Sequence, residues 1–408
     1  MRNTTEDVLI KKDIEPKTLE SLKKAKQKFE EIFGDSRNAI GITAPTGLMI
    51  LGDHTHYNDG ILLSATLNSY TTVILRKRKD YEIKIYNAIN ETSREFNFFD
   101  MPSETDVYFK YVIGITRLLK ADNLINRGFE ALFVNDAPDC IGLGKFSSIQ
   151  IAFLCAFRKA FRLNTDGLLN YVHKNELELL GKISNVAQHY TIRNSKKNKF
   201  YFIDLRTLQE KQYNYNSEYD VVILDTRNKI IDSLSICNER IEECEIGVKG
   251  LRLYIWGIKN LRDVNLEFLL RHIHMLPRRI FNRILYNVRE RIRVEEAIDA
   301  LKKKDYRAFG KIVSQSHWSL SADYELSDDT CDFIVRNSEN IDCVYGSKMI
   351  SCSQYRSTFQ LVRKECAADY IDHITKLYYE KFKKELIAYR FQPAEGMREY
   401  TSKDLEKI

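Results

Sequence analysis

An apolar run that ends on three polar side chains is the feature that most constrains this chain. Residues 40–51 read IGITAPTGLMIL, a composition that predicts a strand. Asp53, His54 and His56 follow that strand within one turn. Polar groups gathered in a turn after an apolar strand are more typical of a binding site than of a core. The sequence therefore predicts a strand that brings these three side chains to a candidate site.

Length and composition indicate a two-domain protein of the cytoplasm. A chain of 408 residues with 44% hydrophobic residues can build two domains that share one cleft. Its apolar runs are shorter than the ~20 residues that span a bilayer, and the polar segment 1–17 is not a secretory signal. The eight cysteines follow no metal-ligand spacing, which indicates reduced thiols. We expect a cytoplasmic protein without a membrane partner.

The charge of the chain does not favour a nucleic-acid partner. The formal net charge is only +6, which is too mild to indicate nucleic acid by itself. Seven arginines lie within one short segment: Arg271, Arg278, Arg279, Arg283, Arg289, Arg291 and Arg293. They indicate either a surface for an acidic partner or a solvated helix face with neighbouring glutamates, and the second interpretation is favoured.

Hydrophobic periodicity predicts helices and strands along the whole chain. Helices are expected over residues 18–34, 106–120, 149–161, 233–251, 288–304, 306–317 and 366–382. Strands are expected over 40–51, 70–76, 82–86, 132–135, 200–204, 219–224, 343–349 and 358–362, and the last two look like a hairpin. A Tyr- and Asn-rich segment, 211–216, interrupts the pattern. The domain division is therefore predicted there, with domains over 1–215 and 216–408.

Three motifs carry a resemblance to a known family. Residues 44–58 read Ala-Pro-Thr-Gly-Leu-Met-Ile-Leu-Gly-Asp-His-Thr-His-Tyr-Asn and resemble the galactokinase signature Ala-Pro-Gly-Arg-Val-Asn-Leu-Ile-Gly-Glu-His-Thr-Asp-Tyr-Asn. Residues 315–327 are similar to the family's Gln-Ser-His-x-Ser-Leu-Arg-x-Asp-Tyr-Glu-Val-Ser, and Asn238, Arg240 and Cys244 resemble a family helix. The resemblance implies the two-domain α+β fold of GHMP kinases. That fold has a mixed sheet with helices in its N-terminal domain and an antiparallel sheet with helices in its C-terminal domain.

The resemblance also implies a nucleotide loop. In the family, Pro-x-Gly-x-Gly-Leu-Ser-Ser-Ser cradles phosphates at a helix N-terminus, where free N–H groups favour an anion. The segment Cys140-Ile-Gly-Leu-Gly-Lys-Phe-Ser-Ser148 is similar to it. ATP and Mg²⁺ are thus the implied cofactors, and Ser148 stands where the family directs a hydroxyl toward Mg²⁺. The alternative is a turn kept for packing, since Phe146 is bulky for a phosphate loop. The implied nucleotide-binding residues are Gly142, Gly144, Lys145, Ser147 and Ser148.

Two positions that carry catalysis in the family lack their functional groups. The arginine of the opening signature is Gly47 here, and the aspartate of Gly-Ile-Met-Asp-Gln-Phe is Ala187 when its glutamine is matched to Gln188. Phosphoryl transfer needs aligned phosphates whose charge is neutralised. An alanine methyl accepts no proton, and glycine supplies no cation. Ser351 and Ser353 further replace glycines of a third family loop.

Sugar recognition is also altered at the positions that the resemblance implies. Asp53 and His54 stand where the family's glutamate and histidine contact sugar hydroxyls, while His56 replaces an aspartate and Cys237 a tyrosine. Asp53, His54 and His56 are the candidate substrate-binding residues. His56, whose ordinary pKa lies near neutrality, and Asp53 are also the candidates for a substitute base.

The leading hypothesis is a galactokinase-like pseudokinase that binds a sugar or a nucleotide and acts as a regulator. Its partners would be a small sugar or sugar derivative and a protein. The alternative is an active ATP-dependent sugar kinase on a non-standard acceptor, with His56 and Asp53 recruited. A third hypothesis is binding of an acidic macromolecule through the arginines between residues 271 and 293.

Overall fold

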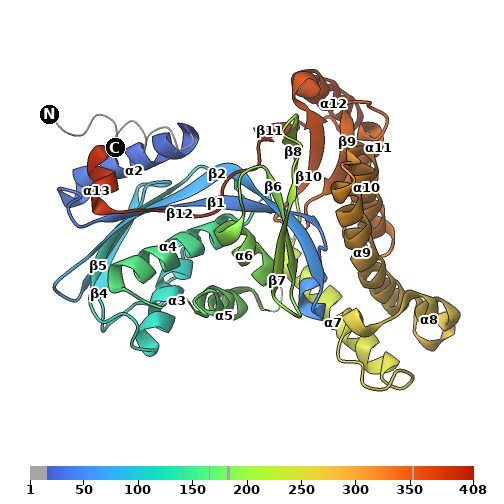
Figure 1. Cartoon of the computed structure of the whole chain (residues 1–408), viewed down its shortest axis with the longest axis horizontal. Helices are drawn as coiled ribbons and strands as arrows, with labels where there is room; N and C mark the ends of the chain where they lie inside the picture. The colour runs from blue at the N-terminus through green and yellow to red at the C-terminus, as the bar shows by residue number, and fades with distance from the viewer. Residues whose placement is uncertain (1–15, 140, 165, 182–183, 352) are drawn as a thin grey trace.

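A computed structural model describes residues 16–139, 141–164, 166–181, 184–351 and 353–408 (Figure 1). Predictions that fall on residues 1–15 or on Cys140 therefore lie outside the described residues. Among the described residues, none of the helices combines the length and the apolar character that crossing a bilayer requires.

The first sheet is mixed and contains eight described strands. Its order is β12-β1-β2-β5-β3-β4, with β6 beside β2 and β7 beside β6. Only β3 and β5 run parallel, and the other pairs are antiparallel. The strands are β1 (Ile40–Leu51), β2 (Ile61–Lys77), β3 (Glu82–Asn87), β4 (Thr92–Asn97), β5 (Phe129–Asn135), β6 (Lys199–Asp204), β7 (Gln209–Asn214) and β12 (Arg398–Tyr400).

Helices cover both faces of this sheet, as Figure 1 shows. The two faces follow from the period of two along a strand: Val73 and Leu75 of β2 pack on one side, and Ile74 packs on the other. The helices α2 (Pro16–Phe33) and α13 (Ser402–Lys407) cover the Ile74 side. The opposite side is covered by α3 (Val107–Ala121), α4 (Lys145–Phe161), α5 (Leu169–Leu180) and α6 (Val186–Asn194).

The second sheet is antiparallel and has the order β11-β8-β10-β9. Its strands are β8 (Tyr219–Lys229), β9 (Val344–Met349), β10 (Tyr355–Arg363) and β11 (Ile387–Phe391). The accompanying helices are α7 (Ser233–Leu251), α8 (Leu266–Arg271), α9 (Arg278–Lys302), α10 (Tyr306–Ala322), α11 (Asp329–Ser338) and α12 (Ala367–Phe382). The predicted fold class, with a mixed N-terminal sheet and an antiparallel C-terminal sheet, is confirmed.

One buried cluster joins the two sheets. Leu48 and Leu63 of the first sheet share it with Val221 and Phe359 of the second, and Phe309 of α10 packs against them. The sheets change between the end of β7 and the start of β8, near the predicted boundary at 215, but β12 returns the C-terminal segment to the first sheet. The division into 1–215 and 216–408 stays a prediction.

One strand was not predicted, and the start of one helix was predicted wrongly. The segment 211–216 interrupts the hydrophobic pattern but not the sheet, because its residues up to Asn214 belong to β7, which pairs with β6. β7 is mostly exposed, so it lacks the alternation that would have identified it as a strand. The helix predicted over 288–304 is α9, which begins ten residues earlier at Arg278. Its first turns carry arginines whose partners lie elsewhere in the chain.

Candidate functional site

A cavity of about 400 Å³ lies at the end of β1, beside the N-terminus of α4. The walls come from the turn after β1, the segment that leads into α4, the end of α5, the start of α6 and the segment after β9. The sequence-predicted residues that line it are Asp53, His54, His56, Gly142, Gly144, Lys145 and Ser147. Gly47, Ala187 and Ser148 are not among the lining residues. The structure therefore brings seven candidate residues together and leaves three outside.

Gln188 covers the position of the family's arginine. Its Nε2 donates a hydrogen bond to the carbonyl oxygen of Gly47 at 3.0 Å. A Cβ at Gly47 would lie 3.3 Å from both Gln188 Cγ and Ile192 Cγ1, and a Cβ at Gly144 would lie 2.3 Å from Gln188 Nε2. The amide thus occupies the space between the two glycines. A neutral side chain stands where the family has a cation.

Ala187 belongs to an apolar cluster. It is fully buried on α6 and packs with Leu62, Tyr201 and Ile203. The side chain of Asn185 caps this helix by accepting from the Ala187 N–H at 3.1 Å. The position therefore presents a methyl group to hydrophobic neighbours, and no proton acceptor reaches the cavity from it.

Asp53 is held in a buried ion pair. Lys348, which is fully buried on β9, pairs with the Asp53 carboxylate and donates to the Ile50 carbonyl at 3.0 Å. Ser351 donates to the other carboxylate oxygen at 2.7 Å, and Tyr286 donates to the Asp53 carbonyl at 2.9 Å. Because a lysine and a serine share this carboxylate, its charge is compensated inside the protein.

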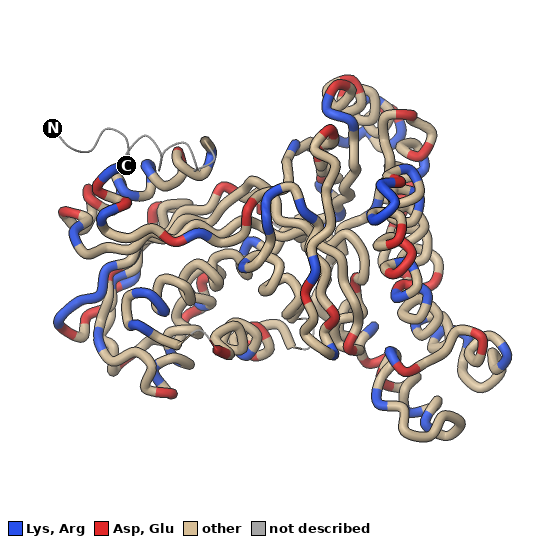
Figure 2. Tube along the Cα trace, viewed as in Figure 1, with Lys and Arg blue, Asp and Glu red and all other residues tan. Residues whose placement is uncertain are grey.

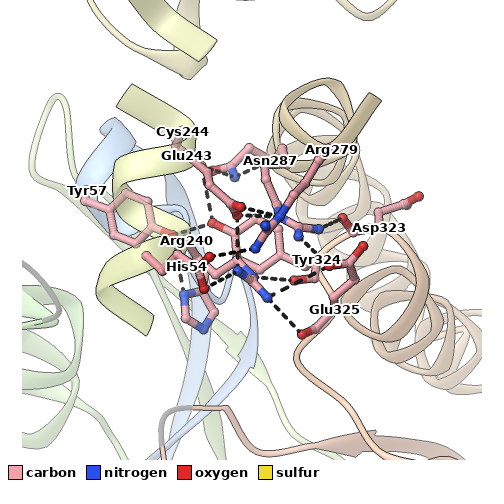
Figure 3. A network of polar contacts seen from close by, with 12 residues as sticks. His54, Tyr57, Arg240, Glu243, Cys244, Arg279, Asn287, Asp323, Tyr324 and Glu325 are labelled. Carbon is pink, nitrogen blue, oxygen red and sulfur yellow. Dashed lines mark hydrogen bonds and ion pairs between the residues drawn. The ribbon is translucent and has the colours of Figure 1, made fainter. Parts of the chain in front are cut away.

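The two histidines differ in their surroundings. His54 is buried with φ 57°, and burial together with Lys348 lowers its pKa from 6.5 to about 3, so the ring is neutral. Its ring centroid lies 5.2 Å from that of Tyr324, and Figure 3 shows it beside Tyr57 and Tyr324. His56 begins the short helix η1 (His56–Asn58) and packs edge-to-face on Tyr57 at 4.8 Å. It also lines a smaller adjoining cavity of about 230 Å³.

The predicted nucleotide loop needs its glycines. Gly142 and Gly144 have φ 82° and 64°, and a Cβ at Gly142 would lie 2.5 Å from Ile350 Cγ2. Gly144 is the N-cap residue of α4. The buried Lys145 ammonium donates to the Ala137 carbonyl at 3.2 Å and to Asp139 at 2.5 Å. The lysine is therefore already paired at the edge of the loop.

The serines of the loop point in different directions. Ser148 is fully buried, and its hydroxyl donates to the Ala44 carbonyl at 2.9 Å and contacts the Thr71 hydroxyl at 2.7 Å. Ser147 lines the cavity and donates to Glu176 at 2.7 Å. Phe146 stacks on Tyr111 with centroids 4.9 Å apart. The hydroxyl that the resemblance implies for Mg²⁺ thus faces the sheet.

Sequence reasoning missed Glu176 and His189. Glu176 on α5 is buried, lines the cavity, and faces the buried His189 of α6 with Nε2 2.9 Å from Oε2. Gln150 and Ser184 donate to the same carboxylate at 3.0 and 2.9 Å. Burial raises the pKa of Glu176, but His189 and the hydrogen bonds outweigh it and lower that pKa. The family motif Gly-Ile-Met-Asp-Gln-Phe could have identified His189, because His189 stands where that motif has its phenylalanine.

These residues do not fit the divalent cation that the fold family implies. In the described ranges there is no group of three or more His, Cys, Asp or Glu side chains arranged to hold a metal ion. Ser148 is engaged with Ala44 and Thr71, and the two carboxylates of the described lining, Asp53 and Glu176, each face a basic side chain.

The arginines between residues 271 and 293 do not form a free basic surface. Arg283 and Arg293 are buried against Glu243 and Glu290, and the exposed Arg271 pairs with Glu267. Figure 2 shows acidic and basic residues interspersed along these helices. The favoured interpretation, a solvated helix face, is wrong for Arg283 and Arg293, because both are buried: Arg283 pairs with Glu243 and Glu325 on other segments, and Arg293 pairs with Glu290 on α9 itself.

Comparisons with known proteins agree with this architecture. A family model described as the galactokinase galactose-binding signature matches residues 27–77. The curated galactokinase of Fusobacterium nucleatum is 28% identical over 364 residues, covering 86% of this chain and 93% of that protein. That of Clostridium acetobutylicum is 27% identical over 381 residues, covering 91% of this chain and 97% of that protein.

Solved structures show the same fold. The structure of Lactococcus lactis galactokinase complexed with galactose superposes with a TM-score of 0.86 at 24% identity, covering 91% of this chain and 98% of that chain. Methanococcus jannaschii mevalonate kinase superposes with a TM-score of 0.61 at 16% identity, covering 86% of this chain and 98% of that one. With the signature, the curated relatives and the fold in agreement, this chain is similar to galactokinases along most of its length and has the fold of the GHMP kinases.

Proposed function

We propose that this protein is a galactokinase-like pseudokinase that binds a small sugar or a nucleotide and regulates a protein partner. The observation that carries the proposal is the state of the two catalytic positions. Ala187 is sealed in an apolar cluster, and the Gln188 amide covers Gly47. Neither position offers a base for the acceptor hydroxyl or a cation for the phosphates.

The sugar part of the proposal rests on the cavity and on the relatives. The matched signature is galactose-binding by its description, and the Lactococcus lactis structure is of a galactose complex. Asp53, His54 and His56 lie together in the wall of the cavity, which is large enough for a hexose. Because Asp53 is tied to Lys348 and His54 is neutral, we expect recognition by hydrogen bonds rather than by free charge.

The nucleotide part rests on the loop before α4. Gly142 and Gly144 keep the left-handed geometry that such a loop needs, and Lys145 and Ser147 lie at the helix N-terminus. ATP is therefore the nucleotide to test first. The proposal of a cytoplasmic protein rests on the free thiols of the six cysteines that the structure describes.

The deciding experiment measures ATP consumption with a panel of hexoses and their derivatives, with Lactococcus lactis galactokinase in parallel. We expect no turnover above background, together with thermal stabilisation by galactose or a related sugar. A true ligand at a hundredfold excess over its Kd stabilises by about 2.7 kcal/mol. Turnover of roughly 1–100 per second would show an active kinase instead.

An active kinase on another acceptor is the second candidate, and the position of His56 favours it. His56 lines both the main cavity and the adjoining one, so a differently placed acceptor would lie beside it. This candidate predicts measurable turnover that His56→Asn and Asp53→Asn each abolish. Unchanged rates in both variants would exclude it.

A further inference from the structure

Glu176 has no coordination position left for a metal ion. A carboxylate offers about four lone-pair sites. Oε1 accepts from Ser147 at 2.7 Å and from Gln150 at 3.0 Å, while Oε2 accepts from Ser184 at 2.9 Å and faces His189 Nε2 at 2.9 Å. Three of these sites accept hydrogen bonds from the protein, and the His189 ring stands in front of the fourth. A cation could bind only by displacing one of these buried donors.

The charges of the residues that line the cavity also disfavour a divalent cation. Asp53 and Glu176 are the carboxylates among the described lining residues, and each has its own buried basic partner, Lys348 and His189. Hard divalent cations bind where oxygen ligands carry uncompensated negative charge. Lys110 and Lys145 also line the cavity. Lys145 is paired with Asp139, so Lys110 adds the uncompensated positive charge of the lining, which favours an anion over a divalent cation.

We infer that this cavity binds a phosphate-bearing ligand without a divalent cation, because the two carboxylates of its described lining already face buried basic side chains. The inference rests on the proposed function and deepens it: the His189 ring stands against the Glu176 carboxylate where a cation would have to approach it. A phosphate group at the N-terminus of α4 then interacts with the backbone N–H groups and the lysines alone. A nucleotide and a phosphorylated sugar share this chemistry.

The first test compares ligand binding with and without the metal. Isothermal titration of the whole protein with ATP, and separately with galactose 1-phosphate, is run in EDTA and again in excess MgCl₂. We expect at least one probe to bind with Kd values that agree within about twofold between the two conditions, a difference well under 1 kcal/mol. The two probes distinguish a nucleotide site from a sugar-phosphate site.

Two results would overturn the inference. Binding that is about tenfold or more tighter in MgCl₂ would show that a cation takes part. Failure of both phosphate-bearing probes to bind in either condition would also overturn it. In that second case, stabilisation by an uncharged sugar would leave the proposed pseudokinase intact, so the two failures are distinguishable.

The second test uses the metal alone and needs no variant. Mn²⁺ is titrated into the wild-type protein, and the free ion is followed by electron paramagnetic resonance. We expect the free Mn²⁺ signal to match that of buffer without protein. Stoichiometric loss of the signal at micromolar Mn²⁺ would contradict the inference.

Variants then assign the effect to the ion pair. His189→Phe introduces the residue of the family motif and removes the imidazole that faces Glu176 Oε2, so we expect Mn²⁺ binding or magnesium-dependent ATP binding to appear. His173→Phe is the comparison variant, because His173 forms a hydrogen bond with the Ser184 hydroxyl and acts on Glu176 only electrostatically, whereas His189 faces the carboxylate directly. Glu176→Gln keeps the shape and is expected to leave the ratio of Kd values in EDTA and MgCl₂ unchanged. A magnesium effect that Glu176→Gln abolishes would assign the carboxylate to a cation after all.

Discussion

Two polar networks of this protein have different roles: one joins helices, and the other lies at the cavity. In the first, α7 and α9 are joined by ion pairs: Arg283 donates to Glu243 at 2.7 Å and to Glu325 at 2.6 Å. Figure 3 shows this network around Glu243, Arg279 and Glu325. In the second, Glu176 and His189 pair across α5 and α6 in the wall of the cavity. The first network holds helices together. In the second network, the Glu176 carboxylate that could bind a divalent cation beside a phosphate ligand is already in contact with protein groups.

The residues of the two networks also differ in how they match the galactokinase pattern. Arg240 and Tyr324 are motif residues, and Arg240 donates to the Tyr324 carbonyl at 2.8 Å. Tyr324 in turn packs beside His54. Gly47, Ala187 and His189 are departures from the pattern, and all three lie in or next to the cavity wall. The difference teaches that residues of the scaffold around the cavity can match the pattern while residues at the cavity depart from it, which is what the proposed function requires.

Breaking the first network should have the largest effect. Arg283→Met keeps the apolar stem but removes a fully buried cation from Glu243 and Glu325. We expect the free energy of unfolding to fall by about 3 kcal/mol, since Glu243 and the Asp323 carbonyl lose a buried charged donor, even though Arg240 and Arg279 still pair with Glu243. Arg271→Met is the matched control, because Arg271 and Glu267 are both 71% exposed and their pair contributes little. Urea denaturation of both variants measures the difference; equal losses would contradict a structural role for Arg283.

Introducing a carboxylate at Ala187, near the cavity, should lower the free energy of unfolding by less than Arg283→Met does, and it should produce no kinase activity. Ala187→Asp places a charge against Leu62, Tyr201 and Ile203, and we expect a loss of about 2 kcal/mol for a buried carboxylate with poor partners. Ala187→Asn, of equal size and without charge, separates the charge from the shape. Unfolding curves and the ATP-consumption assay are measured on both variants. Hexose-dependent turnover in Ala187→Asp would show that the site is one substitution from activity.

The sequence could predict the strands, helices and turns that are specified by residues close together in the chain. The strand at 40–51 and the polar turn after it were predictable, because strand composition and the following polar residues are local signals. The helix after the Gly142–Gly144 loop was predictable for the same reason, although α4 begins at Lys145 rather than at 149. The GHMP fold itself followed from motif resemblance rather than from periodicity.

Pairings between distant segments could not be predicted from the pattern. Lys348 and Asp53 are 295 residues apart, and their ion pair depends on how the two sheets pack. Glu176 and His189 lie on different helices, so their contact depends on the angle between α5 and α6. Arg283 looked solvated because a buried charge is recognised only once its partners are known.

His54, which packs beside Tyr324 and also lines the cavity, should make the stability of the protein depend on pH. Its folded pKa of about 3 lies below the ordinary 6.5, so below pH 6.5 the unfolded chain binds a proton that the folded protein does not. Stability is therefore full above pH 6.5 and falls as the pH drops toward 3. From about pH 7.5 to about pH 5.5 we expect His54 to account for a loss of about 1.4 kcal/mol.

His54→Asn tests this expectation, because asparagine tolerates the left-handed backbone at φ 57°. The wild type and the variant are unfolded in urea at several pH values. Glu176 titrates below its ordinary 4.5 because its pKa is lowered, so it contributes little in this window. A wild-type slope equal to that of the variant would contradict a neutral buried His54.

The smallest effect concerns Lys145 at the mouth of the cavity. Its ammonium pairs with Asp139, whose side chain is 62% exposed. Such a pair is weak, so Asp139→Ala should leave stability nearly unchanged while freeing the lysine for an anionic ligand. We expect phosphate-bearing probes to bind about two- to threefold tighter, a gain well under 1 kcal/mol. Asp100→Ala removes the same charge from an exposed turn away from the cavity and is the control for a general change in net charge. If both variants tighten binding equally, the lysine is not a ligand group, and the cavity relies on the α4 N-terminus and Lys110 for its positive potential.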